Sequence, residues 1–424
     1  MNPRKHWAVF INNQSNKEYF IQLLLKEHTP EGFKELEGLQ GVLFSKLSLY
    51  KFIDDEERHD EKTITQDTEQ SLKSMSSGEQ KKALLQHLLQ SNPDFLILDN
   101  PFDNLDTEFQ KELKKLLKTV SNKTNIIQLI SRKSDLLPFI TQFTSLEGKS
   151  IAFHKKPSAL VESNNNTPDY SNNTVPPPLH SYPYTEETLL TLKNISVSFD
   201  GKPVLKNIHW EIKPGEFWQL AGKNGSGKTT ILSMITGDNS KGYGQELYLF
   251  GRKKGTGESI WDIKEKLGYV TPSMTDKFTG HHTLEHMIIS GLNDSIGLYK
   301  RPSEIQLQLA KKWLQFIEMW DNRNTYFHDL SMGQKRLIMT VRAMVKHPLL
   351  LILDEPTAGL DDKSALLFTH LVNKIAHEST TAIVFVSHRK EPGLEPQFIY
   401  ELQMSDKGSI GIVTKKHSTD KNIV

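Results

Sequence analysis

A glycine-rich segment has the residue types and spacing needed to hold a triphosphate. Gly222-Lys223-Asn224-Gly225-Ser226-Gly227-Lys228-Thr229 matches the pattern G-x-x-x-x-G-K-S/T. The glycines let backbone N–H groups close on the β- and γ-phosphates, while Lys228 supplies a positive charge. The hydroxyl of Thr229 can ligate Mg²⁺, and a helix that begins here adds its dipole. The segment therefore predicts a binding site for a nucleoside triphosphate and Mg²⁺.

Two carboxylates and a histidine follow apolar runs further along the chain. Leu349 to Leu353 is followed by Asp354-Glu355, and Ala382 to Val386 is followed by Ser387-His388. We expect Asp354 to hold Mg²⁺ through water, Glu355 to act as the general base on the attacking water, and His388 to contact the γ-phosphate. Taken alone, Asp354-Glu355-Pro356 could be a solvated turn and His388 a structural histidine. The phosphate loop favours the catalytic interpretation.

Neighbouring parallel strands would bring these groups together. Glu216 to Ala221 reads as a buried strand before the loop, and Thr229 to Ile235 as the helix after it, with Gly237 as its stop. Five aliphatic residues in a row predict strands buried on both faces, which are typical of parallel sheets with helices on either side. Ligands of such sheets bind at the carboxyl edge of the strands. The sequence therefore predicts an α/β fold with the site at that edge.

The same order of motifs occurs twice. Ser331-Met332-Gly333-Gln334 precedes Asp354 as Ser76-Ser77-Gly78-Glu79 precedes Asp99, and Gly to Asp is 21 positions in both halves. Asp99 is followed by Asn100 and, 33 positions on, by Arg132; Asp354 to His388 is 34 positions. Agreement in order, spacing and chemistry indicates a tandem repeat.

Composition bounds the remaining classes of protein. The 424 residues carry a formal net charge of +1 and no cysteine, which argues against a generally basic nucleic-acid surface and excludes disulfide scaffolds and zinc–thiolate sites. We expect no signal peptide, because the N-terminus has no long apolar region, and no membrane span, because no run of 18 apolar residues occurs. The segment 156–186 is rich in asparagine and proline, which predicts a flexible linker; an ordered surface loop is the alternative. The expected domains are 1–155, the linker 156–186, and 187–424.

At this point the second half resembles the nucleotide-binding domain of an ATP-binding cassette (ABC) protein, from Leu190 to about Gln403. Leu330-Ser331-Met332-Gly333-Gln334 resembles the family signature, and Ala358-Gly359-Leu360-Asp361 its D-loop. The resemblance implies a P-loop NTPase fold, ATP and Mg²⁺ as cofactors, ATPase activity, and nucleotide contacts from Gly222 through Thr230 and from Asp354. It also implies that Phe199 stacks on adenine, although a core strand aromatic is the equal alternative. Pro272 stands where the family usually has glutamine, a departure that puts coupling to a membrane partner in doubt.

The first half resembles a truncated, degenerate cassette without a phosphate loop. Aligning Phe10-Ile11-Asn12 with Leu220-Ala221-Gly222 puts Glu18 at Lys228. An ion pair at about 4 Å and a dielectric near 20 contributes roughly 4 kcal/mol. A glutamate in place of the lysine would turn this attraction into repulsion and would forbid phosphate binding. Asn100 would replace the base, and Arg132 the histidine.

The resemblance also implies how the halves cooperate. ABC proteins sandwich ATP between one phosphate loop and the partner's signature. Ser76 and Gly78 would therefore complete the site at Lys228, in a pseudo-dimer within one chain. The reciprocal site at Ser331 and Gly333 would be inert.

The tandem arrangement resembles the molybdenum-transport or photorepair ATP-binding proteins, on Gly255 to Lys264 and Ser290 to Tyr299. The alternative is that these two segments are ordinary surface segments of a generic cassette. The expected role is to energise transport through a separate transmembrane permease, from the cytoplasm or the inner face of the membrane. The alternative is a soluble ABC regulator, or a translation- or repair-associated ATPase, without a transport partner. The translation group usually has two intact phosphate loops and a long charged linker, which this chain lacks. Nucleic acid is not an expected partner. A steep salt dependence of DNA binding would instead support a nucleic-acid-binding role.

Overall fold

The computed structural model describes residues 4–26, 29–59, 61–65, 70–156, 173–179, 183–298 and 300–416. Contacts within the chain define two compact units. The first unit is Met1–Thr167 with Gly359–Lys363, and the second unit is Pro168–Ala358 with Ser364–Val424. The predicted linker 156–186 falls largely on residues 157–172 and 180–182, which lie outside the described residues. In the part of the linker that is described, the N–H of Val175 donates to the carboxylate of Glu378.

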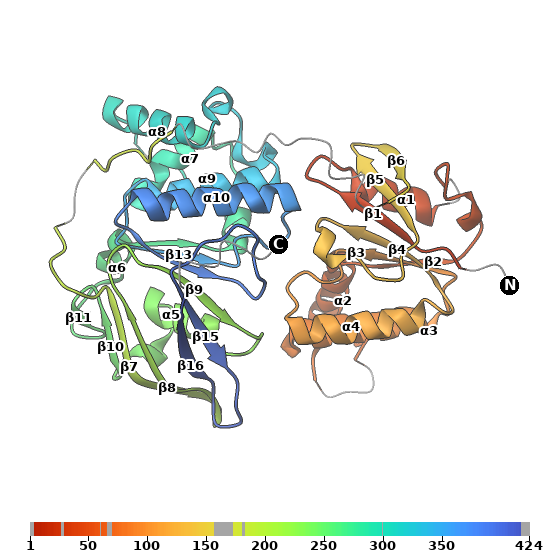
Figure 1. Ribbon diagram of the computed structural model, residues 1–424, viewed down its shortest axis with the longest axis horizontal. Helices are drawn as coiled ribbons and strands as arrows, with labels where there is room; N and C mark the ends of the chain where they lie inside the picture. Colours follow the sequence, from red (N-terminus) through yellow and green to blue (C-terminus); the bar gives the residue numbers. More distant parts are fainter. Residues whose placement is uncertain are drawn as a thin grey trace. The chain divides into compact units, whose positions relative to one another are not determined.

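The first unit is built on one six-stranded sheet in the order β2-β3-β4-β1-β5-β6, in which only β6 is antiparallel. Its strands are β1 (Trp7–Ile11), β2 (Gly41–Phe44), β3 (Phe95–Asp99), β4 (Asn125–Ile130), β5 (Gln142–Glu147) and β6 (Ser150–His154). Its helices are α1 (Lys17–Leu25), α2 (Lys46–His59), α3 (Ser77–Gln90) and α4 (Thr107–Val120). Apolar residues of α2, α3 and α4 pack on one face of the sheet and those of α1 on the other (Figure 1).

The second unit repeats this sheet in the order β12-β13-β14-β9-β15-β16 and adds an antiparallel sheet, β11-β10-β7-β8. The strands are β7 (Leu190–Phe199), β8 (Lys202–Ile212), β9 (Phe217–Gly222), β10 (Glu246–Leu249), β11 (Arg252–Lys253), β12 (Leu267–Val270), β13 (Leu350–Asp354), β14 (Ala382–Val386), β15 (Phe398–Gln403) and β16 (Ile410–Lys415). The helices are α5 (Lys228–Thr236), α6 (Ile260–Lys266), α7 (Leu284–Ser290), α8 (Glu304–Phe316), α9 (Met332–Met344) and α10 (Asp362–Glu378). The predicted strands and the helix after the glycine-rich loop are confirmed within one residue at each end.

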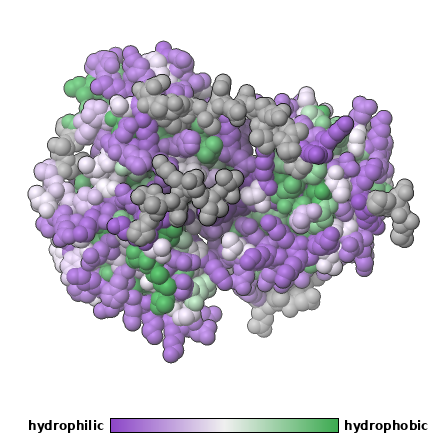
Figure 2. Space-filling view, in the orientation of Figure 1, coloured by the Kyte–Doolittle hydropathy of each residue, from purple (hydrophilic) through white to green (hydrophobic). Residues whose placement is uncertain are grey.

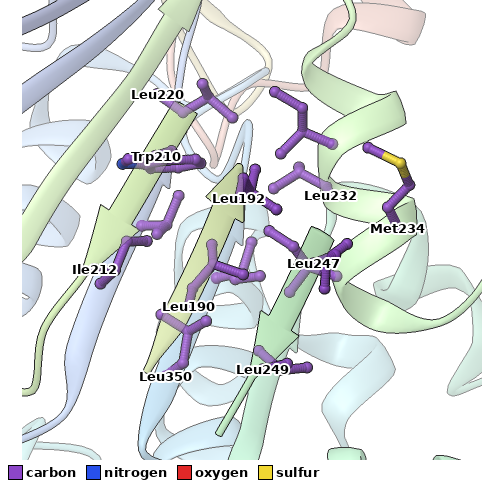
Figure 3. Packing of buried hydrophobic residues seen from close by; sticks show 14 of the residues in the cluster. Leu190, Leu192, Trp210, Ile212, Leu220, Leu232, Met234, Leu247, Leu249 and Leu350 are labelled. Carbon is purple, nitrogen blue, oxygen red and sulfur yellow. The ribbon is translucent and has the colours of Figure 1, made fainter. Parts of the chain in front are cut away.

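Helix α5 is held between the two sheets of the second unit. Figure 3 shows Leu232 and Met234 of α5 packed among apolar residues of the antiparallel sheet, including Leu192 and Leu247. Burying a side chain of this size contributes about 1.5–3 kcal/mol, so several of them fix the helix firmly. The loop that precedes α5 therefore starts from a rigid support.

The predicted stop of this helix is also confirmed. Gly237 caps α5 with φ +92°, a left-handed conformation that glycine adopts without steric penalty. On the opposite face of the larger sheet, Phe368 of α10 contacts Phe385 of β14.

The surface of each unit is mainly hydrophilic in the view of Figure 2. Among the described residues, every helix is too short or too polar to cross a bilayer. In the described part of the chain between β2 and α3, the first unit has one α-helix, α2, whereas α7 and α8 stand between β12 and α9 in the second unit.

Candidate functional site

The glycine-rich loop leaves the end of β9 and enters α5, as its sequence predicts. Gly222, Gly225 and Gly227 have φ values of +152°, +78° and +94°. A Cβ on Gly227 would lie 2.5 Å from Cδ2 of Leu205, and one on Gly222 would lie 2.6 Å from Oγ of Ser226. Both the backbone conformation and the close packing therefore require glycine here.

The loop offers donors toward a ligand. The N–H groups of Gly225, Gly227 and Thr229 meet no acceptor among the described parts of the chain. Lys228 is buried, and its Nζ donates to the carbonyl oxygens of Gly222 and Lys223 at 2.7 and 3.0 Å. Thr229 is exposed, while Thr230 is half-buried. The loop and the first turn of α5 thus combine a positive charge, N–H groups without an acceptor in the described chain and a hydroxyl, which suits a phosphate chain.

The two predicted carboxylates lie at the carboxyl end of β13, beside β14 and close to β9. Asp354 pairs in register with Val386, and Val386 pairs with Leu220 of β9. The next residue, Glu355, has φ +48° and donates its N–H to the carbonyl of Val386 at 3.0 Å. A left-handed conformation is uncommon for glutamate, and here it turns the chain at the sheet edge.

Glu355 and His388 are brought together by neighbouring strands. Nδ1 of His388 lies 2.8 Å from Oε2 of Glu355, and only 4% of the histidine side chain is exposed. Nε of Arg389 donates to Nε2 of His388 at 3.4 Å, which makes Nδ1–H the donor to the carboxylate. His388 therefore orients Glu355.

The Asp354 carboxylate sits in a confined and negatively charged place. Burial, and next the neighbouring charge of Glu355, raises the pKa of Asp354 to about 6. Two carboxyl groups held together in this way fit a bound cation, which would relieve their repulsion.

Tyr269 is a site residue that the sequence reasoning missed. It lies on β12, and its hydroxyl donates to Oδ2 of Asp354 at 3.4 Å. Burial raises the pKa of Tyr269 above its usual range, so the phenol stays a donor. Its place one residue from the end of the strand beside β13 was the available signal, because parallel strands end at one edge.

Two further predictions of the sequence concern Phe199 and Pro272. Phe199 ends β7 and is 38% exposed, so the alternative of a core aromatic is wrong. Pro272 begins a 3₁₀ turn, Pro272–Lys277, and its carbonyl accepts a hydrogen bond from buried Arg336 at 3.1 Å. The loop with the unexpected proline is thus tied to α9.

The two signature-like segments have the same local structure. Ser76 caps α3 in a capping box with Glu79, and Ser331 caps α9 in a capping box with Gln334. Each box ties the first turn of its helix to the N-cap residue, so the start of each helix is well fixed. Gly78 is buried against α4, since a Cβ on it would lie 2.5 Å from the ring of Phe109.

The register predicted for the first half is wrong by one residue. Asp99 pairs with Leu129 and Leu129 with Val9, as Asp354 pairs with Val386 and Val386 with Leu220. Lys17 lies eight positions after Val9, and Lys228 eight after Leu220. Lys17, the first residue of α1, is therefore the counterpart of Lys228, and Glu18 that of Thr229.

The counterpart of His388 is also corrected. Leu129 and Val386 are equivalent, because each pairs with the aspartate of its unit. Ser131 and His388 each lie two positions later, so Ser131 is the counterpart of His388, and Arg132 lies one residue further on. Oγ of Ser131 is 3.1 Å from Oδ1 of Asn100, as His388 is hydrogen-bonded to Glu355. The first unit thus keeps the lysine and the aspartate, but an amide and a hydroxyl replace the glutamate and the histidine.

Comparisons with known proteins agree with this geometry. Residues 205–358 match the ABC transporter family model. The ABC transporter ATP-binding protein ModF of Escherichia coli is 38% identical over 341 residues, which are 77% of this chain and 69% of that protein. An uncharacterised ABC transporter ATP-binding protein of Schizosaccharomyces pombe is 32% identical over 76% of this chain and 66% of its own length.

Solved structures extend the likeness in fold to both units. The archaeal ribosome recycling factor aABCE1 aligns with 97% of this chain and 86% of its own, with a TM-score of 0.61 and 14% identity. At this identity the likeness concerns the fold alone. The chain therefore belongs to the ABC transporter ATP-binding proteins: it is a tandem P-loop ATPase that binds ATP.

Proposed function

We propose that the chain has one competent ATP site, built on the second unit. The observation that carries the proposal is the meeting of three motifs at one sheet edge: the loop after β9, Asp354-Glu355 after β13, and His388 after β14. In this assignment the N–H groups from Gly222 to Thr230 and the ammonium of Lys228 bind the phosphates. The exposed ring of Phe199 stacks on adenine.

Glu355 is the general base of the proposed reaction. Its carboxylate takes a proton from the water that attacks the γ-phosphorus, and ADP leaves as the bond from the γ-phosphorus to the β,γ-bridging oxygen breaks. The hydrogen bond from His388 holds the carboxylate in place. Thr229 and Asp354 would hold Mg²⁺, which neutralises charge on the phosphates. The hydrogen bond from Tyr269 fixes one oxygen of Asp354.

We further propose that the first unit completes this site, in a pseudo-dimer within the chain. Ser76 is exposed at the N-terminus of α3, where the helix favours a negatively charged γ-phosphate. Gly78 lets the first turn of α3 pack directly on Phe109 of α4, which supports the N-terminus of the helix. The reciprocal site, at Ser331 and Gly333, is inert because the first unit has no phosphate loop.

A charge placed on either signature tests the composite site. Asp is as good an N-cap as Ser, so Ser76→Asp keeps α3 capped while placing a carboxylate toward the phosphate. Glu79→Gln is made in the same chain, because the introduced carboxylate and that of Glu79 would otherwise repel each other in the capping box. The substitution also gives position 79 the residue type of Gln334 in the second signature. At about 4 Å and a dielectric near 20 the repulsion is roughly 4 kcal/mol, so we expect kcat/KM for ATP to fall at least about 100-fold.

The matched controls are Glu79→Gln alone and Ser331→Asp. We expect both to keep kcat/KM within about threefold of the unmodified chain, since neither places charge at the competent site. Equal losses in the two signatures, or a larger loss for Ser331→Asp, would refute the composite site. Thermal unfolding of each variant verifies that it is folded.

For the physiological role, we propose that the ATPase energises transport through a separate membrane subunit, at the cytoplasmic face. The similar proteins named as ABC transporter ATP-binding proteins support this role. The tied loop at Pro272 favours a second candidate, a regulator without a transport partner, because that loop lacks the glutamine expected for coupling.

Affinity capture separates the two roles. Glu355→Gln with ATP should accumulate the closed form and retain its partner, and Lys228→Ala, which cannot hold ATP, is the control. An integral membrane protein captured in stoichiometric amount by the first variant alone supports transport. Stoichiometric capture of soluble protein only, from detergent-solubilised membranes and cytosol together, overturns it in favour of the regulator.

A further inference from the structure

The first unit contains an ion pair at the place that corresponds to the nucleotide site of the second. Nζ of Lys17 lies 2.8 Å from Oδ2 of Asp99. These residues are the counterparts of Lys228 and Asp354 in the strand register. In the second unit the same two positions are not paired in this way: Nζ of Lys228 donates to loop carbonyls, and Asp354 accepts from Tyr269.

Asp99 depends on this lysine. Only 9% of its side chain is exposed, against 38% for Lys17, and its second oxygen, Oδ1, is buried without a donor among the described residues. The residue at the position of Tyr269 is Leu43, which has no hydroxyl to donate. The Lys17 ammonium is thus the counter-charge of a buried carboxylate, and removing one partner of such a pair is strongly destabilising.

The N–H groups of the loop between β1 and α1 already have acceptors within the protein, and that of Asn13 donates to Oδ2 of Asp361 at 3.2 Å. The N–H of Gln14 donates to Oδ1 of Asn12 at 2.8 Å, and that of Ser15 donates to the carbonyl of Asn12 at 3.1 Å. The N–H of Asn16 donates to the carbonyl of Gly148 at 2.7 Å. The described residues of this loop include no glycine and no residue with positive φ, so its donors do not converge on a phosphate.

We propose that the Lys17 ammonium is a built-in substitute for the bound cation at this former nucleotide site. It neutralises Asp99 permanently, and the N–H groups of Gln14, Ser15 and Asn16 already have acceptors within the first unit. The first unit therefore keeps its sheet edge folded without nucleotide or metal. Lys17 no longer binds phosphate: it is a structural counter-ion.

A double-mutant cycle tests the pair in the full chain. We compare Lys17→Met, Asp99→Leu and the double variant by calorimetric unfolding, with hydrogen exchange of β3 as the readout specific to the first unit. Lys17→Met should lower the unfolding temperature of this unit by about 5 °C or more and speed exchange in β3. The double variant should recover at least half of that loss, because no unpaired charge remains, and Lys17→Arg should behave as the unmodified chain.

The exposed pair of Lys5 and Glu35, at 3.0 Å in the same unit, supplies the control. Lys5→Met should shift the unfolding temperature by less than about 2 °C, since exposed pairs contribute little. Equal shifts for Lys17→Met and Lys5→Met, or purely additive effects in the cycle, overturn the proposal.

Nucleotide binding gives an independent readout. In Lys228→Ala, a fluorescent ATP analogue with Mg²⁺ should show no site that depends on Lys17. Saturable binding in Lys228→Ala that is lost when Lys17→Met is added would show that Lys17 still holds phosphate, and would overturn its role as counter-ion. Neither unfolding nor nucleotide binding depends on ATP turnover, so both tests can be interpreted even if the catalytic assignment in the second unit fails.

Discussion

Replacing Glu355 by Gln separates ATP binding from ATP hydrolysis. The carboxylate oxygen Oε2 lies 2.8 Å from Nδ1 of His388, and 24% of the Glu355 side chain is exposed. The amide oxygen of Gln accepts the same hydrogen bond, so the edge of the sheet keeps its geometry. The amide cannot take a proton from water. Because a positioned general base contributes about 10²–10⁴-fold, we expect kcat to fall by this factor, or roughly 3–5 kcal/mol in activation free energy.

The assay measures steady-state phosphate release together with equilibrium binding of a fluorescent ATP analogue. Binding should stay within about threefold of the unmodified chain, since neither the loop nor Lys228 is touched. The matched control is Asn100→Glu, which places a carboxylate at the corresponding position of the first unit and should not restore turnover to Glu355→Gln. Turnover above a tenth of the unmodified rate in Glu355→Gln would refute its role as the base.

Three further predictions concern binding, packing and pH. Lys228→Ala should weaken binding of the ATP analogue at least about 100-fold, because an ammonium–phosphate contact is worth several kcal/mol; unchanged affinity in the titration would contradict the site. Gly78→Ala should destabilise the first unit by about 1–3 kcal/mol in denaturant titration, since its methyl group meets the Phe109 ring, and Phe109→Leu should relieve part of that loss. His6 is buried, and its Nδ1 accepts from the N–H of Ile126; burial, then Lys118 and Arg4, lowers its pKa below the 6.5 of the unfolded chain. The contribution of His6 to the free energy of unfolding is therefore fully present above pH 6.5 and is lost as the pH falls below that value. His6→Asn should remove this pH dependence when unfolding is followed from about pH 5 to 8.

Local pattern was sufficient for the second unit. The strand and helix on either side of the glycine-rich loop, the buried strands before Asp354 and His388, and the stop at Gly237 all follow from short-range sequence. Each depends on an aliphatic run or on a glycine, whose conformational preferences are strong and local. The meeting of these groups at one place then needed only the rule that parallel strands end at one edge of the sheet.

Register in the first unit could not be predicted in this way. The loop Asn12 to Asn16 has no glycine to mark where β1 turns into α1, so the apolar run Val9 to Ile11 can be aligned one residue off without breaking any local rule. Strand pairing removes the ambiguity, because a slip of one residue would turn every side chain of β1 to the opposite face of the sheet.

By itself, the sequence determined that the chain repeats one architecture and that its second half carries the chemistry of ATP hydrolysis, because glycines, a lysine and carboxylates at fixed spacing encode that chemistry locally. Only the tertiary structure decided that Lys17 takes the place of Lys228 and pairs with Asp99, and that Tyr269 reaches Asp354. These contacts join residues more than 80 positions apart in the chain, and such partners are chosen by hydrogen bonding between strands.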